Sequence, residues 1–296
     1  MNEKLIIFDS NAVLYRSFFA LPELTTSGGE KIQAIYGFFR VVFKILKEFN
    51  PDFLIFCFDF PAKTFRHKKL KEYKSTREKM PSDLQLQVEK IKKILLENSF
   101  CVLEKEGFEA DDLIASLVKS ETTKDLEKII VTKDRDLFQL IDEKTKIYFL
   151  GTKKKDSVIF DKEKIEKEYN IEPSLFADLK SLIGDASDNI KGIKKIGKKT
   201  AVNIIKKTGK LKIFFQNKDF WKLEEKERII LLKNKDLILK NLSLIELEPF
   251  KIDFSLKESE INALKIEAFR KIFENLGFKS LLKDLDSLHI FKNELK

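Results

Sequence analysis

The sequence predicts an α/β fold in which helices flank a mainly parallel central sheet, followed by a helical C-terminal part. Short apolar runs alternate with helical patterns as far as residue 132, which is typical of a parallel sheet with crossover helices. From residue 174 the pattern becomes mostly helical. Several apolar runs end in an aspartate, and ligands of open α/β sheets bind at the carboxyl ends of the strands. We therefore expect the functional site at that edge.

The first elements form the start of this sheet. The apolar run Lys4–Asp9 predicts a buried parallel strand that carries Asp9 at its carboxyl end. Helices are predicted at 11–20 and 32–49. The run Phe53–Asp59 repeats the pattern of a strand followed by an aspartate. Two predicted strands thus deliver acids to the same edge.

The next elements complete the predicted sheet. A helix is predicted from residue 82 to about residue 98, because its apolar residues fall on one face. Phe100–Leu103 and Lys128–Thr132 are predicted strands. Between them lies the predicted helix Glu109–Lys119, with three acids in its first turn, a position that the helix dipole favours.

The C-terminal part is predicted to be helical. A helix at 174–183 leads into the segment GDASDN. The segment 188–208 then predicts a short helix, a glycine-flanked hairpin turn and an amphipathic helix. Further helices are predicted at 228–240 and 258–275. With no clear linker, we expect an α/β core at 1–173 and a helical part at 174–296, packed together as one catalytic unit.

Carboxylates are the main functional signal, because most lie next to an apolar run. They are Asp9, Asp59, Glu109, Asp111, Asp112, Asp134, Asp136, Asp185 and Asp188. Singly, the clusters are also typical of a helix start, a loop and a polar turn. Together they predict one acidic pocket for divalent cations, since oxygen ligands suit such ions. The net charge of +9 predicts that these ions act on a polyanion.

A basic stretch, Lys63–Lys79, interrupts the α/β pattern. A base could stack on Tyr73 while Lys74 and Arg66 contact phosphates. The alternative is a solvated loop. In the hairpin, exposed N–H groups and lysines could hold a phosphate backbone without reading bases. The alternative there is an ordinary helix–turn–helix packing unit. Its lysines are Lys194, Lys195, Lys198 and Lys199.

The composition excludes several other classes. The two cysteines, Cys57 and Cys101, lie far apart and only two histidines are present, so a zinc site is not expected. The first residues lack the pattern of a signal peptide, and no uncharged apolar run reaches membrane-spanning length. We expect a cytoplasmic, nucleoid-associated protein without membrane contact. An AT-biased genome is an alternative source of the lysines.

Five motifs in order carry a resemblance to a known family. They are an aspartate at 9 followed by Leu14-Tyr15-Arg16, then FDFPAKTFRHKKLKEYKSTR, FEADDLIASL, TKDRDLFQL and GDASDNIKGIKKIGKKTA. This order resembles the 5′-nuclease family, specifically the 5′→3′ exonuclease (flap endonuclease) domain of bacterial DNA polymerase I and related phage enzymes. The likeness covers nearly the whole chain without a polymerase part, which leaves a stand-alone nuclease and an excised polymerase domain both open.

The resemblance implies a PIN-like core, a helical arch at about 61–98 and a helix–hairpin–helix at about 188–208. It assigns one metal to Asp9, Asp59, Glu109 and Asp111, and a second to Asp111, Asp134, Asp136 and Asp188. Asp112 and Asp185 would act through water or as outer ligands. Asp111, Arg66 and Lys74 form the implied catalytic set. The side chains of Arg66 and Lys74 would contact the scissile phosphate. DNA contacts fall to Arg16, Tyr73, Arg77, Gly192, Lys194, Lys195, Gly197, Lys198, Lys199 and Thr200.

The same resemblance implies the chemistry and the partners. Two or more Mg²⁺ or Mn²⁺ ions would catalyse phosphodiester hydrolysis, with a K⁺ ion at the helix–hairpin–helix. The substrate would be DNA with a 5′ flap, nick or gap, including RNA-primed ends, in replication and repair. A monomer is expected, with a DNA polymerase or ligase as protein partner. Two alternatives are a catalytically weak structure-specific DNA-binding module and a PIN-like ribonuclease.

Three residues depart from the family pattern. Ser10 replaces a common glycine, Lys191 a common proline, and Lys195 a hairpin glycine. If the backbone at Lys195 requires a positive φ, a lysine is strained there. The hairpin ion site depends on that position.

Overall fold

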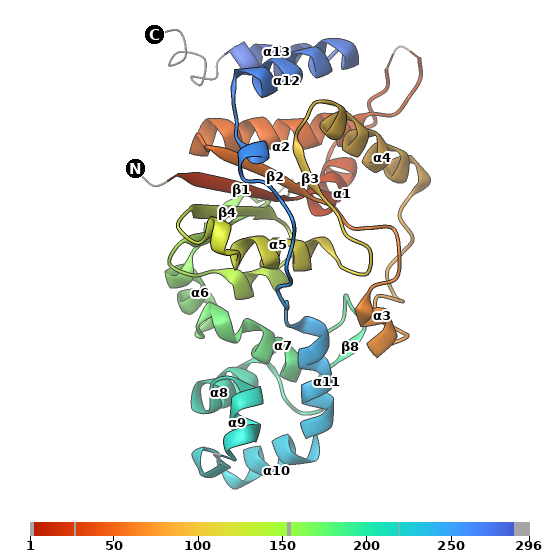
Figure 1. Ribbon diagram of the computed structural model, residues 1–296. Coiled ribbons are helices and arrows are strands. Elements are labelled where there is room, and N and C mark those ends of the chain that lie inside the picture. Colours follow the sequence, from red (N-terminus) through yellow and green to blue (C-terminus); the bar gives the residue numbers. More distant parts are fainter. Residues whose placement is uncertain (1–2, 27, 153–154, 219, 287–296) are drawn as a thin grey trace.

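A six-stranded sheet forms the centre of the computed structural model, which describes residues 3–26, 28–152, 155–218 and 220–286 (Figure 1). The strand order is β3-β2-β1-β4-β5-β6, and only the β5–β6 pair is antiparallel. The strands are β1 (Lys4–Asp9), β2 (Phe53–Cys57), β3 (Cys101–Leu103), β4 (Glu127–Thr132), β5 (Thr145–Phe149) and β6 (Val158–Phe160). The predicted α/β fold with a mainly parallel sheet is confirmed.

Both faces of the central strand are buried, which explains its unbroken apolar sequence. Leu5 and Ile7 face one apolar cluster, and Ile6 and Phe8 face the other. Figure 1 shows the corresponding two layers, with α2 on one face of the sheet and α5 on the other. The helices of this part are α1 (Ser10–Ala20), α2 (Gln33–Phe49), α3 (Phe65–Lys69), α4 (Ser82–Glu97), α5 (Ala110–Val118) and α6 (Lys162–Tyr169).

The helical part follows the sheet in the sequence and lies at one end of it (Figure 1). A two-stranded ribbon, β7–β8, separates α7 from α8. The last two helices, α12 and α13, return to the core and pack on α2 (Figure 1). The elements are α7 (Phe176–Ile183), β7 (Gly184–Asp185), β8 (Ile190–Lys191), α8 (Lys198–Thr208), α9 (Leu211–Asn217), α10 (Glu225–Lys233), α11 (Lys235–Ile245), α12 (Ala263–Leu276) and α13 (Lys279–Asp286).

Short 3₁₀ turns complete the described elements: η1 (Glu121–Thr123), η2 (Asp136–Leu140), η3 (Pro173–Leu175), η4 (Phe220–Lys222) and η5 (Lys257–Ser259). Within the residues that the structure describes, no helix is both long and apolar enough to span a membrane.

Several elements differ from the sequence prediction. The predicted helix at 228–240 is two helices, because Asn234 ends α10 and begins α11 in a non-helical conformation. The predicted short helix before the hairpin is absent: β8 and a turn occupy that segment, and the preceding helix is α7. The predicted helix at 258–275 begins as η5, and α12 follows it. The strands β5 and β6 and helix α6 escaped prediction.

Candidate metal centre

The carboxyl edge of the sheet gathers the acids. Asp9 is the last residue of β1, and Asp59 and Asp134 each follow a strand by two residues. Glu109 caps the N-terminus of α5, which places Asp111 in its first turn. The strand order changes direction at β1 and β4, the point at which ligands bind in open α/β sheets.

One group of acids forms no ion pair among the described residues; it consists of Asp9, Asp59, Asp111 and Asp134, and we call it the unpaired group. Asp9 accepts hydrogen bonds from the Thr132 hydroxyl at 2.6 Å and from the Ala12 amide at 3.1 Å. Asp59 accepts one from the Ala110 amide at 2.8 Å. Within the described part of the chain, none of the four forms an ion pair.

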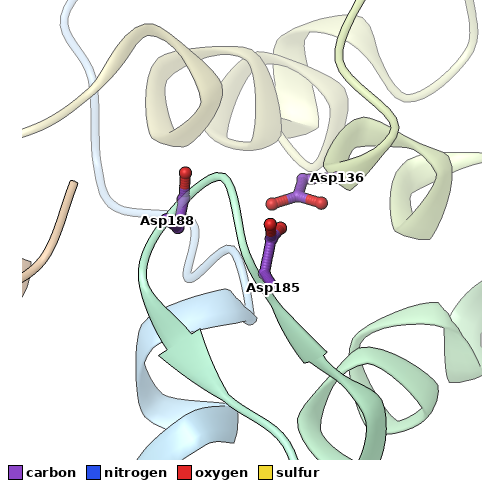
Figure 2. Close-up of side chains that lie close together, drawn as sticks. All are labelled: Asp136, Asp185 and Asp188. Carbon is purple, nitrogen blue, oxygen red and sulfur yellow. The ribbon is translucent and has the colours of Figure 1, made fainter. Parts of the chain in front are cut away.

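A second group is held by basic side chains; it consists of Glu109, Asp136, Asp185 and Asp188, and we call it the paired group. Lys74 Nζ lies 2.7 Å from Glu109, and an Arg77 nitrogen lies 2.5 Å from Asp188. Lys180 forms ion pairs with both Asp136 and Asp185. Figure 2 shows how Asp136, Asp185 and Asp188 lie, with one ligand oxygen of each within 4.8 Å of the others.

Arg66 and Asp112 form a buried ion pair away from solvent. Two guanidinium nitrogens donate to the two Asp112 oxygens at 2.6 and 2.7 Å, and Nε donates to the carbonyl of Leu244 at 2.7 Å. Arg66 is 1% exposed and Asp112 is 0% exposed. In this arrangement Arg66 does not face a phosphate and Asp112 does not face an ion, because each neutralises the other. The expected catalytic role of Arg66 and metal role of Asp112 differ from this geometry.

Breaking that pair is expected to destabilise the fold. Arg66→Met leaves the Asp112 carboxylate buried without an ion-pair partner and with only the Glu109 amide as hydrogen-bond donor, which costs about 3–5 kcal/mol. Urea denaturation followed by circular dichroism measures the change. Lys69→Met is the matched control, because Lys69 is exposed, forms no ion pair among the described residues, and contacts the Ser243 carbonyl and the Phe65 ring; its effect should stay within about 0.5 kcal/mol. A loss below about 1 kcal/mol for Arg66→Met would contradict the structural role.

Tyr73 also differs from its expected role. Its side chain is buried, and its hydroxyl lies 3.1 Å from Glu109 and 2.9 Å from Asp188. The ring packs edge-on against His67. Tyr73 thus links the two acids from within the protein, and its face is not presented to a base. The cause is tertiary: the segment before α4 folds back onto the β7–β8 loop, where the Lys74 amide donates to the Asp188 carbonyl.

The hairpin places its basic residues on the surface. Gly192 is required by close packing, since a Cβ there would lie 2.1 Å from the Ile183 carbonyl oxygen. Ile193 and Ile196 are buried and anchor the turn. Lys195 has a φ of +71°, so the lysine adopts the left-handed conformation that is strained for a residue other than glycine. The exposed residues are Lys194, Lys195, Gly197, Lys198, Lys199 and Thr200.

A cleft of about 1580 Å³ connects the acids with this basic surface. Asp134 and Asp185 line it beside the acid cluster, and Lys198 lines it at the start of α8. Arg16 projects from α1 into its wall and donates to the Gly151 carbonyl at 2.7 Å. Its other basic residues are Arg77, Lys133, Arg135, Lys155 and Lys180. The cleft could therefore hold a polyanion next to the acids.

The acids repel one another without cations. Burial, with Asp59 and Asp134 nearby, raises the pKa of Asp9 to about 7. Burial and Asp134 likewise raise the pKa of Asp136 to about 7, and burial and Asp134 raise the pKa of Asp111 well above its usual value. Such a set of oxygen ligands fits hard divalent cations, which would hold these carboxyls ionised.

These shifts predict a pH dependence for the metal-free protein. Between about pH 5.5 and about pH 8 the folded state releases the protons of Asp9 and Asp136, whose pKa values are about 7. The unfolded state has already released them near pH 3.8. Stability must then fall as the pH rises, by about 2 kcal/mol for each group. In EDTA we expect a lower melting temperature at the higher pH, and Mg²⁺ should reduce the difference. A melting temperature in EDTA that rises over this range would contradict it.

Lys180 is the residue of this centre that sequence reasoning missed. It lies on α7, five residues before Asp185, in a helix that the sequence did predict. Because α7 ends just before β7, a cation in its last turn faces the acids that follow. A lysine in the last turn of a helix that leads into an acidic loop is the signal that could have found it.

An acid cluster at the carboxyl edge of a parallel sheet, beside a basic cleft, is suited to metal-dependent hydrolysis of a polyanion. A family model described as the N-terminal resolvase-like domain of 5′-3′ exonuclease matches residues 4–170. A second, described as the C-terminal SAM fold of 5′-3′ exonuclease, matches residues 171–267. The chain belongs to the 5′-3′ exonuclease family.

Relatives agree with this assignment, and a solved structure shares the fold. A 5′-3′ exonuclease of Aquifex aeolicus is 37% identical, with 96% of each chain covered. DNA polymerase I of Caldicellulosiruptor bescii is 36% identical over 95% of this chain, and this chain spans 33% of that polymerase. The bacteriophage T5 D15 flap endonuclease, solved with DNA and metal ions, shares the fold at a TM-score of 0.65 and 20% identity, covering 97% of this chain and 99% of that one.

Proposed function

We propose that this chain is a structure-specific 5′-nuclease that uses Mg²⁺ or Mn²⁺ to remove 5′ flaps and RNA primers from DNA in replication and repair. The observation that carries the proposal is the division of the acids into two neighbouring groups at one sheet edge. A basic cleft joins them to an exposed lysine hairpin. The family assignment supports the reaction, and the DNA and metal ions solved with the T5 enzyme support the substrate and cofactor classes.

The chain's own residues divide the work. The unpaired group is suited to one ion, and Asp136, Asp185 and Asp188 of the paired group are suited to a second. When bound, such ions supply a more acidic water and stabilise charge on the phosphate and the leaving oxygen. Glu109, the fourth member of the paired group, is held by Lys74 and Tyr73.

Lys74 is the basic side chain best placed for the scissile phosphate. Its ammonium is half-buried beside Glu109, within the acid cluster. We assign it transition-state charge stabilisation, as positioned cations provide elsewhere. Arg66 becomes a positioning residue, because it fixes Asp112 and thereby the start of α5 that carries Asp111.

The DNA would lie along the cleft, with the duplex on the hairpin. Lys194, Lys195, Lys198 and Lys199 would contact phosphates, and Arg16 and Arg77 would contact the strand nearer the acids. We propose that the core at 1–173 and the helical part at 174–296 act as one catalytic unit. An arch at 61–98, a monomer near the nucleoid in the cytoplasm, a potassium ion at the hairpin and a polymerase or ligase partner stay predictions.

The decisive experiment is cleavage of 5′-labelled flap DNA with Mg²⁺ and with EDTA. A matched RNA flap, a single strand and a blunt duplex are the comparison substrates. We expect Mg²⁺-dependent release of the DNA flap near the junction, because the acids need divalent ions and the hairpin needs duplex DNA. Tight binding without cleavage in Mg²⁺ or Mn²⁺ would favour a DNA-binding module. Preference for the RNA flap would favour a ribonuclease.

A further inference from the structure

Lys180 holds two members of the paired group together. Its ammonium bridges Asp136 and Asp185. The three side chains are 15%, 13% and 10% exposed, so water screens these ion pairs only weakly. The ammonium therefore holds both carboxylates at once.

The same carboxylates are those that a divalent ion would use. One ligand oxygen from each of Asp136, Asp185 and Asp188 lies within 4.8 Å of the other two, and Figure 2 shows the carboxylates of Asp136 and Asp185 facing one another. An ammonium donates hydrogen bonds and offers no lone pair to a metal. Lys180 and an ion thus exclude each other from this pair of carboxylates.

We propose that Lys180 is an internal competitor for the second divalent ion: it holds Asp136 and Asp185 in the metal-free protein and must release them before that ion binds. This inference rests on the proposed function. The unpaired group has no such competitor within the described residues. Binding is therefore ordered, with the first ion entering the unpaired group and the second binding more weakly.

The strength of the competition follows from occupancy. If Lys180 holds the carboxylates about nine-tenths of the time, the apparent affinity for the second ion falls about tenfold. Removing the ammonium should raise the affinity for the second ion by the same factor. Replacing it with a guanidinium should strengthen the competition, because arginine pairs with carboxylates through two parallel hydrogen bonds. The second-ion affinity should then follow the order Lys180→Met, wild type, Lys180→Arg.

Calorimetric titration with Mn²⁺, without DNA, tests this order. Lys180→Met should bind the second ion about tenfold more tightly than the wild type, and Lys180→Arg should bind it more weakly. Lys162→Met is the charge-matched control, because Lys162 pairs with Glu143 outside the acid cluster; it should leave both affinities unchanged. Circular dichroism establishes that each variant is folded, and Lys180→Arg carries the test alone if the methionine variant does not fold.

The outcomes separate the two proposals. A wild-type protein that binds no Mn²⁺ would overturn the proposed function itself. Two ions on the wild type, with equal or weaker second-ion affinity in Lys180→Met, would overturn only the role of Lys180. Equal affinities for the wild type and Lys180→Arg, should the methionine variant not fold, would overturn it as well. Tighter binding of the second ion by Lys162→Met would also count against the role of Lys180, because the loss of any positive charge would then explain the effect.

Discussion

Asp111→Asn is expected to lower the single-turnover cleavage rate by on the order of 10³-fold, while duplex binding stays nearly unchanged. Asp111 lies in the first turn of α5, where burial and the neighbouring carboxyls raise its pKa, and belongs to the group without ion pairs. An amide at this position removes a negative charge from the metal ligands. Because the hairpin lysines lie outside the acid cluster, they should still hold the duplex.

The measurement compares quenched-flow cleavage in Mg²⁺ with fluorescence anisotropy of a labelled duplex in EDTA. Asp125→Asn is the matched control, because Asp125 is exposed and the substitution makes the same change of charge outside the acid cluster. It should cleave at the wild-type rate. Cleavage by Asp111→Asn at that rate would refute the assignment of Asp111 as a metal ligand.

Lys74→Ala is expected to slow the chemical step by about 10²-fold and to weaken DNA binding by no more than about threefold. The Lys74 ammonium lies 2.7 Å from Glu109, and the amide of the same residue donates to the Asp188 carbonyl. The side chain is therefore fixed from two sides within the acid cluster. A cation fixed in this way stabilises developing charge at little cost in reorganisation.

Single-turnover rates at saturating enzyme separate chemistry from affinity. Lys71→Ala is the control, because Lys71 is an exposed lysine of the same basic stretch. This variant measures the effect of losing one positive charge away from the acid cluster. Lys74→Arg should keep part of the rate, since the charge remains. If Lys74→Ala changes the dissociation constant and leaves the rate intact, Lys74 tethers DNA and takes no part in chemistry.

The sequence could predict which edge of the sheet carries the acids. Asp9 and Asp59 directly follow apolar runs, and parallel strands end on the same side. The first turn of the helix at 109–119 could be predicted from its acids and its apolar face. These features are local, or follow from a rule that holds for every open parallel sheet.

Pairings between distant residues could not be predicted. Arg66 and Asp112 lie 46 residues apart in the sequence, and nothing local distinguishes Arg66 from the neighbouring basic residues. Tyr73 resembles a stacking residue until the fold buries it against Glu109 and Asp188. For Lys180 only the pairing with Asp136, 44 residues away, was hidden in this way, because Asp185 follows it closely in the sequence. Each of these pairings depends on which polar and charged side chains the fold buries beside one another.

Short elements also escaped prediction. The strands β5 and β6 lie toward one edge of the sheet, where burial is incomplete and the apolar pattern is weak. The break at Asn234 falls inside a continuous helical pattern, so that the sequence indicates one helix where two are formed. Tertiary packing decides both cases, because local preference there is small.

The return of α12 and α13 to α2 has a consequence for how the protein can be divided. Phe269 and Phe273 pack on Phe39 and Phe43, and the Ile261 amide donates to the carbonyl of Asp52, just before β2. A fragment cut at the border between the two family models would leave this aromatic face of α2 bare and prone to aggregation. The border between the two family models therefore marks a change in sequence similarity and not a boundary between folding units. During synthesis, nearly the whole chain must leave the ribosome before the aromatic contacts between α2 and α12 can form.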